Sequence, residues 1–319
     1  MTFWQQRRQR TLGDRARLSG VGVHNGQPVS MMLCPAEPDS GIVFVRSSPN
    51  LGEVEIPARS QVVSSTELCT VLGDPKGASV ATVEHLLAAF AGLGVDNALI
   101  EIDGPEVPVM DGSAEPFVTA IDGVGLRAQA APRRWIRIER PVRVEIGTAV
   151  AEFRPHPRAR LEVSIDYACS VIGRQELCLD LTPKAFRREL ARARTFGYMR
   201  DVDQLWAAGF ALGSSLENSV VISENGVVNP EGLRYPDEFV RHKMLDAIGD
   251  LALAGLPIQG LYRSHRGGHK LNALAVSTLL ADGDAWSIVS EPADREFRAE
   301  ARPDLAQGLA APAFAPEVL

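Results

Sequence analysis

Apolar and polar positions alternate through much of the first part of the chain. Between residues 10 and 46, apolar residues recur at every second position between glycines, as in RARLSGVGVHNG and GIVFVR. A period of two residues is typical of strands with one buried face, and glycine and asparagine mark the turns between them. We therefore expect this region to fold as strand, turn and strand.

Helical spacing of apolar residues occurs at four places farther along. It is found at residues 79–93, 113–121, 183–194 and 237–254, and glycines that can end a helix follow the first and the last of these. The helix at 183–194 is rich in arginine and amphipathic. These four segments are predicted to be α-helices.

Strands are predicted between the helices. Residues 97–102 (NALIEI) have the pattern of a buried strand, and residues 135–153 and 161–167 have the pattern of sheet. Strands and helices thus occur in both parts of the chain, which favours the α+β class.

The stretch 122–134 (DGVGLRAQAAPRR) divides the pattern. It is rich in glycine, alanine, proline and charge, and we interpret it as a linker between domains. We predict an N-terminal domain at 1–126, a C-terminal domain at 127–300 and a loosely ordered tail at 301–319.

The two predicted domains share a faint internal repeat. Val83-Glu84-His85 opens a helix in the first domain, and Val240-Arg241-His242 occupies a similar place in the second. We therefore expect two related two-layer α/β sandwich domains. Their helices would pack between the sheets and deliver one histidine each to a shared cleft.

Composition limits the class of protein. Of 319 residues, 45% are hydrophobic and 23% are charged, as in compact globular proteins, and the net charge of -7 argues against a nucleic-acid partner. Four scattered cysteines, no signal-peptide pattern and no apolar run of membrane-spanning length favour the cytoplasm and no membrane insertion. We expect a monomer that acts on a small molecule.

The segment RHKMLDAIGDL, residues 241–251, contains candidate metal ligands. His242, Asp246 and Asp250 are spaced by four residues, so they share one helix face and can meet one cation. A solvated polar stripe would have the same spacing. The apolar residues between them bury much of this helix, and buried charges need partners or a metal.

Two further motifs carry candidate chemistry. In Glu84-His85, adjacent helical residues point about 100° apart, so one can bind a metal while the other faces a reacting water. The alternative is a capping carboxylate beside a core-edge histidine. In Gly267-Gly268-His269, the glycines allow a close approach to a ligand and present a loop histidine; a plain hairpin turn is equally compatible.

Longer segments resemble one known family. The segments VEHLLAAFAGLGVDNALIEIDGPEVPVMDGSAEPFV, ARARTFGYMRD and EFVRHKMLDAIGDL, with GGHKLNA after them, are similar to the UDP-3-O-acyl-N-acetylglucosamine deacetylases. That family carries out the committed step of lipid A synthesis in Gram-negative bacteria. The matching motifs run from GVGVHNG to GGHKLN in the family's order and spacing.

The resemblance implies a zinc-dependent amide hydrolase. It implies that Zn²⁺ is held by His85, His242 and Asp246. It also implies four catalytic residues: Glu84 as general base, His269 as its cationic or acid partner, Asp250 to orient His269, and Thr195 to help stabilise the oxyanion.

The resemblance further implies substrate contacts. An insert at residues 197–222, with the strand–helix–strand pattern, is expected to form the acyl-chain passage. The implied substrate-binding residues are Phe196, Lys243, Arg266 near the diphosphate, Tyr167 near the uracil, and Tyr198, Trp206 and Phe210. A lysine that some members place toward the nucleotide is Ala149 here.

The expected reaction is hydrolysis of the N-acetyl group of UDP-3-O-acyl-N-acetylglucosamine, which yields acetate and the free amine. Two alternatives remain open at this stage. One is a zinc amidohydrolase for another N-acyl sugar, and the other is a non-catalytic module that binds a nucleotide sugar.

Overall fold

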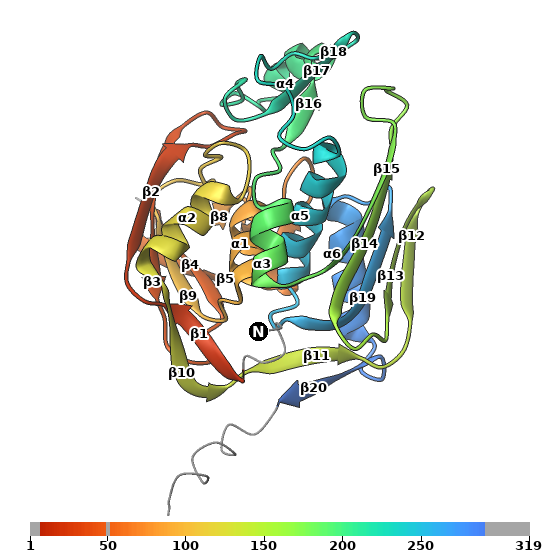
Figure 1. Cartoon of the computed structure of the whole chain (residues 1–319). Helices are drawn as coiled ribbons and strands as arrows, with labels where there is room; N and C mark the ends of the chain where they lie inside the picture. Colours follow the sequence, from red (N-terminus) through yellow and green to blue (C-terminus); the bar gives the residue numbers. More distant parts are fainter. Residues whose placement is uncertain (1–6, 49–51, 291–319) are drawn as a thin grey trace, which may run out of the picture.

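The central helices of this protein pack between two sheets. The computed structural model describes residues 7–48 and 52–290, and Figure 1 shows the central helices with one sheet on each side. The α+β class predicted from the sequence is confirmed. The predicted tail at 301–319 lies outside the described residues, and the domain boundary at 126 stays a prediction.

The first sheet has five strands in the order β2-β3-β9-β4-β5. Alternate residues of β3, namely Val29, Met31 and Leu33, are buried, as the period of two predicts. The parallel pair β4–β9 is the one parallel pairing of this sheet. The strands span β2 (Ala16–Val21), β3 (Pro28–Pro35), β4 (Ile42–Ser48), β5 (Gly52–Pro57) and β9 (Ala98–Ile102).

The second sheet has seven strands around β19. Strand β19 (Ile258–His265) pairs antiparallel with β13 and parallel with β14 and β11. The other strands span β11 (Arg134–Ile138), β12 (Val142–Ile146), β13 (Ala149–Arg154), β14 (Ala159–Asp166), β15 (Arg174–Asp180) and β20 (Trp286–Ser290).

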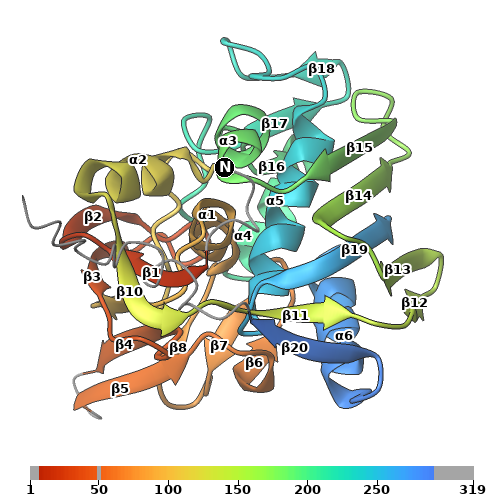
Figure 2. The ribbon, with the colours of Figure 1, turned by 60° about the horizontal axis from the view of Figure 1, so that its bottom comes forward.

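The predicted linker is not irregular. It contains strand β10 (Leu126–Pro132), which pairs antiparallel with β1 (Arg8–Leu12). Figure 2 shows β10 and β11 running in succession from one half of the molecule to the other. Pairing with β1 satisfies the backbone groups of this connection, and the buried Gln129 side chain donates to the carbonyl of Ala36 at 2.8 Å.

Two small sheets complete the strands. One comprises β6 (Val63–Ser65), β7 (Val71–Gly73) and β8 (Ser79–Val80). The other comprises β16 (Phe196–Tyr198), β17 (Val220–Ser223) and β18 (Gly226–Val227), and the short helix α4 (Val202–Ala207) lies between β16 and β17 in sequence. The segment predicted as an insert thus contains a strand, a helix and a parallel strand at one end of the molecule (Figure 1).

Helices α1 (Glu84–Leu93) and α5 (Glu238–Ala252) pack tightly against each other at the centre. A Cβ atom on Gly249 of α5 would lie 2.0 Å from the carbonyl oxygen of Glu84, so only glycine permits this approach. Gly94 ends α1 in the left-handed conformation, and its N–H donates to the carbonyl of Phe90. Both helices were predicted, as was α2 (Glu115–Val124).

Two predictions of secondary structure were wrong in detail. The amphipathic helix at 183–194 is a short α3 (Pro183–Ala185) followed by a π-turn at Phe186–Leu190. The buried Phe186 ring fills the space that Gly92 leaves on α1, a long-range contact that the spacing does not encode. His269, predicted to lie in a loop, is the first residue of α6 (His269–Ala281).

Within the described ranges, no helix has the length and apolar character needed to cross a bilayer.

Candidate active site

The three predicted metal ligands converge between α1 and α5. His85 is the second residue of α1, while His242 and Asp246 lie one turn apart on α5. The Nε2 atoms of His85 and His242 lie 3.5 and 3.3 Å from the same Asp246 Oδ1. All three side chains are buried, and their ligand atoms lie within 4.8 Å of one another.

The donor set fits a divalent cation. Asp246 Oδ1 is buried and accepts no hydrogen bond, so an oxygen with lone pairs faces the two imidazoles. His242 Nδ1 bonds the carbonyl of Ala193 at 3.1 Å, which leaves Nε2 available to a metal. Burial lowers the pKa of His242 to about 3, so its imidazole is neutral, as a ligand must be.

Lys243 lies beside the ligand group. Its Nζ donates to Asp246 Oδ2 at 2.7 Å, so the two oxygens of Asp246 have different roles. Burial alone would raise the pKa of Asp246, but His242 and Lys243 hold that pKa well below its usual range. Asp246 is therefore an anion in the folded protein and can bind a cation through Oδ1.

The residues predicted as base and acid face each other. His269 Nε2 lies 3.6 Å from Glu84 Oε1. Burial raises the pKa of Glu84, although His269 and His85 oppose this rise. Burial also disfavours the charged form of His269, yet Asp250 and Glu84 outweigh it and raise the pKa of His269 to about 9. The Glu84 carboxyl group and the His269 imidazolium thus meet beside the metal ligands.

Asp250 organises a hydrogen-bond network that the sequence analysis found only in part. Its Oδ2 accepts from His269 Nδ1 at 2.9 Å and from Asn272 Nδ2 at 2.8 Å. Its Oδ1 accepts from the Thr70 hydroxyl at 2.6 Å. The Tyr262 hydroxyl in turn donates to Asn272 at 2.7 Å. The three groups that donate to Asp250 are buried or partly buried, and both of its carboxylate oxygens accept hydrogen bonds.

Thr70 connects the two halves of this network. Its backbone N–H donates to Glu84 Oε2 at 3.1 Å, while its hydroxyl reaches Asp250. One buried residue thereby positions both the predicted base and the carboxylate that orients the predicted acid. The signal for Thr70 in the sequence is weak, because a single threonine after a cysteine has no distinctive spacing.

Phe196 and Tyr167 lie over the ligand group. The Phe196 ring contacts the rings of Tyr167 and His242 at centroid distances of 5.9 and 6.1 Å, and Lys243 Nζ lies 5.6 Å from its centroid. The structure thus brings three of the predicted substrate-binding residues, Phe196, Tyr167 and Lys243, to the metal ligands.

The insert contacts the GVGVHNG loop. The Phe210 ring packs edge-on against His24 at 5.5 Å, and Leu212 donates its N–H to the His24 carbonyl at 3.1 Å. Burial lowers the pKa of His24, and His269 and His85 lower it further because they lie nearby. The structure places His24 between the insert and the site.

Glu106 holds that loop in place and was not found from the sequence. Its buried carboxylate accepts from the backbone N–H groups of His24 and Asn25 at 2.9 and 3.0 Å. It also accepts from the hydroxyl of Thr82, two residues before Glu84, at 2.9 Å. Glu106 therefore ties the loop to the start of α1.

The contacts of the other predicted residues are with neighbours outside the ligand group. Trp206 is 52% exposed and donates to the Ala211 carbonyl. The backbone N–H of Thr195 donates a hydrogen bond to the Gly112 carbonyl at 2.8 Å. Arg266 pairs with Asp166 at 2.9 Å, and Arg200 lies 4.7 Å over the Tyr198 ring.

Comparison with known proteins identifies the family of this chain. The profile of the family described as UDP-3-O-acyl N-acetylglycosamine deacetylase matches residues 9–281. The chain is 52% identical over 282 residues to the UDP-3-O-acyl-N-acetylglucosamine deacetylases of Brucella ovis, Brucella abortus and Brucella melitensis, a match that covers 88% of this chain and 98% of each relative. The chain belongs to the UDP-3-O-acyl N-acetylglycosamine deacetylase family.

Proposed function

We propose that this protein is a zinc-dependent deacetylase that hydrolyses the N-acetyl group of UDP-3-O-acyl-N-acetylglucosamine, the committed step of lipid A synthesis. The observation that carries the proposal is the orphaned Asp246 oxygen between two imidazoles, beside a buried Glu84–His269 pair. Family membership supplies the substrate. The four cysteines, all free in the structure, support a reducing compartment, and we infer the cytoplasm.

Zinc is the metal that this donor set favours. Two imidazoles and one carboxylate are a common set for catalytic zinc, with a fourth position left for water or substrate. Bound there, zinc would polarise the acetyl carbonyl and lower the pKa of water toward about 7. The neutral His242 and the ionised Asp246 are already in the protonation states that such binding needs.

The side chains of the site divide the proton chemistry. Glu84 accepts the proton of the attacking water, and its raised pKa moves it toward the range of an efficient general base. The His269 cation, oriented by Asp250, stabilises the negative charge that develops on the acetyl carbonyl oxygen. It can also donate a proton to the leaving amine. Lys243 is assigned to substrate binding, and the Thr195 hydroxyl is assigned to stabilising the oxyanion.

The lipid is assigned to the insert. Exposed apolar side chains gather between residues 199 and 216, where Met199, Trp206, Leu212 and Leu216 are 40–52% exposed. Such a concentration on one short segment is unusual for a surface and is typical of a binding region. The contact of Phe210 with His24 brings this segment next to the site.

The metal assignment predicts a loss of zinc from three variants. His85→Ala, His242→Ala and Asp246→Ala each remove one of three ligands and should lower bound zinc from about one per chain to a small fraction, with activity lost. Elemental analysis of the purified proteins measures this. His156→Ala, in the loop between β13 and β14, serves as the control and should retain its zinc. Full zinc in all three ligand variants would refute the assignment.

The division of proton chemistry predicts variants that retain metal but lose activity. Glu84→Gln and His269→Gln should keep zinc and lose roughly 10²-fold or more in kcat, the scale of general acid–base catalysis. Acetate release under saturating substrate, together with zinc analysis, tests this. Glu101→Gln, on the exposed side of β9, is the matched control. Loss of zinc from Glu84→Gln would identify Glu84 as a ligand instead.

The Asp250 network predicts a role for Thr70 in turnover. Thr70→Val preserves shape and the backbone N–H to Glu84 but removes the hydroxyl that donates to Asp250. We expect kcat to fall by about tenfold or more while KM and zinc content hold, because outer partners of a catalytic group orient it. Thr70→Ser should restore the rate. If Thr70→Val lowered only the melting temperature, the hydroxyl would be structural.

The lipid assignment predicts an effect that depends on the acyl chain. Trp206→Glu puts a charge on an exposed residue of the insert and should raise KM for the acylated substrate about tenfold or more, since each buried methylene contributes about 0.8 kcal/mol. Activity toward the sugar without its acyl chain should be low and unchanged. Ile288→Glu, equally exposed at 52% on β20, is the control. Equal losses on both substrates would place the lipid elsewhere.

A further inference from the structure

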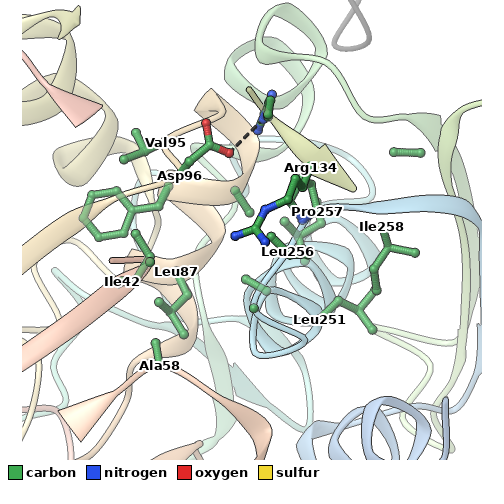
Figure 3. Close-up of a pocket in the computed structure, with 18 of the residues that line it drawn as sticks. Ile42, Ala58, Leu87, Val95, Asp96, Arg134, Leu251, Leu256, Pro257 and Ile258 are labelled. Atoms are coloured by element: carbon green, nitrogen blue, oxygen red, sulfur yellow. Dashed lines mark hydrogen bonds and ion pairs between the residues drawn. The ribbon is translucent and has the colours of Figure 1, made fainter. Parts of the chain in front are cut away.

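A cavity lies on the side of α1 and α5 that faces away from the metal ligands. It has a volume of about 130 Å³ and is lined by Leu87 and Phe90 of α1 and by Ile248 and Leu251 of α5 (Figure 3). With 100° of rotation per residue, these side chains lie on the helix faces opposite to those of the metal ligands. None of the residues assigned above to the reaction lines this cavity.

The walls of the cavity are apolar. Figure 3 shows Ile42, Leu87 and Val95 from the first half of the molecule on one side, and Leu251 and Ile258 from the second half on the other. A volume of this size has room for about ten water-sized groups. An apolar lining of this extent favours an alkyl chain over a polar small molecule.

The rim of the cavity is cationic. Four arginines and two aspartates line it: Arg59, Arg133, Arg134, Arg160, Asp39 and Asp96. Three of the arginines have carboxylate partners, which are Asp96 for Arg133, Asp39 for Arg134 and Asp180 for Arg160. Arg59 has no carboxylate within ion-pair distance among residues 7–48 and 52–290, so one positive charge at the rim is uncompensated.

Two glycines make room for the Arg59 guanidinium. A Cβ atom on Gly255 would lie 1.6 Å from Arg59 Nη1, and one on Gly41 would lie 3.3 Å from Nη2. Both glycines have positive φ, 82° and 69°, which other residues rarely adopt. The half-buried guanidinium thus lies against bare backbone at the cavity wall. Nearby, Arg134 Nε is buried and makes no hydrogen bond, so a second donor lacks an acceptor.

We propose that this cavity binds a medium-chain fatty acid, with the carboxylate on Arg59 and the alkyl chain between α1 and α5. The Arg59 guanidinium, which has no carboxylate partner, can bind one anion. Its planar shape matches a carboxylate through two parallel hydrogen bonds. The apolar walls take the chain. About ten water-sized groups is also the size of octanoate, which has about ten non-hydrogen atoms.

A ligand in this cavity contacts the two helices that carry the metal ligands. Ile248, on the cavity wall, lies between Asp246 and Asp250 in α5, and Leu87 follows His85 by two residues in α1. A ligand here contacts both helices from behind the site and leaves the substrate side open. The proposal does not depend on the deacetylase reaction, because binding can be measured without turnover.

Calorimetric titration of the purified zinc-loaded protein with octanoate tests the proposal. Octanoate should bind, and 1-octanol, which has the same chain without the charge, should bind at least about tenfold more weakly. Arg59→Gln removes the cation and should weaken octanoate binding by about tenfold or more. Ala91→Phe, on the cavity wall of α1, should block the alkyl chain.

Two controls separate this cavity from other places where a fatty acid can bind. Arg17→Gln, an exposed arginine of β2, should bind octanoate as the wild type does. Trp206→Glu, in the insert assigned to the acyl chain, reports on any octanoate that binds there instead of in this cavity. The proposal is overturned if octanoate does not bind up to its solubility limit. It is equally overturned if Arg59→Gln and Ala91→Phe both bind normally, or if only Trp206→Glu loses binding.

Discussion

The close approach of α1 and α5 is the contact on which the site depends. The backbone of Glu84 lies so near Gly249 that any side chain there would collide with it. This contact brings His85 on one helix to the oxygen of Asp246 on the other. A shift of one ångström between the helices would separate the ligand atoms, so the core packing sets the geometry of the metal group.

Burying several charged groups in one place costs desolvation free energy. Ion pairs and hydrogen bonds within the site offset this cost. Glu84, Asp246 and Asp250 are all buried acids, and they are balanced by Lys243 and by the His269 cation. One acceptor remains unpaired, namely Asp246 Oδ1. A cation at that point would complete the balance, which is why the arrangement fits a metalloenzyme better than a binding module with a degenerate site.

The sequence predicted those parts of the site that local spacing encodes. His242 and Asp246 share a helix face because they are four residues apart, and that periodicity survives any tertiary context. Thr70 and Glu106 were missed because their roles arise from contacts between segments distant in sequence. Strand β10 was missed for a similar reason, since its composition is that of a linker and only its partner β1 makes it a strand.

The same physical argument explains why one helix pair can present two different surfaces. Successive residues of a helix point about 100° apart, so α5 offers His242 and Asp246 to the metal group and Ile248 and Leu251 to the cavity behind it. The polar face needs fixed partners, whereas the apolar face needs only to exclude water. The fold therefore tolerates a cavity behind α1 and α5 more easily than a loose contact among the metal ligands. The uncompensated Arg59 at its rim is the feature that simple packing does not explain.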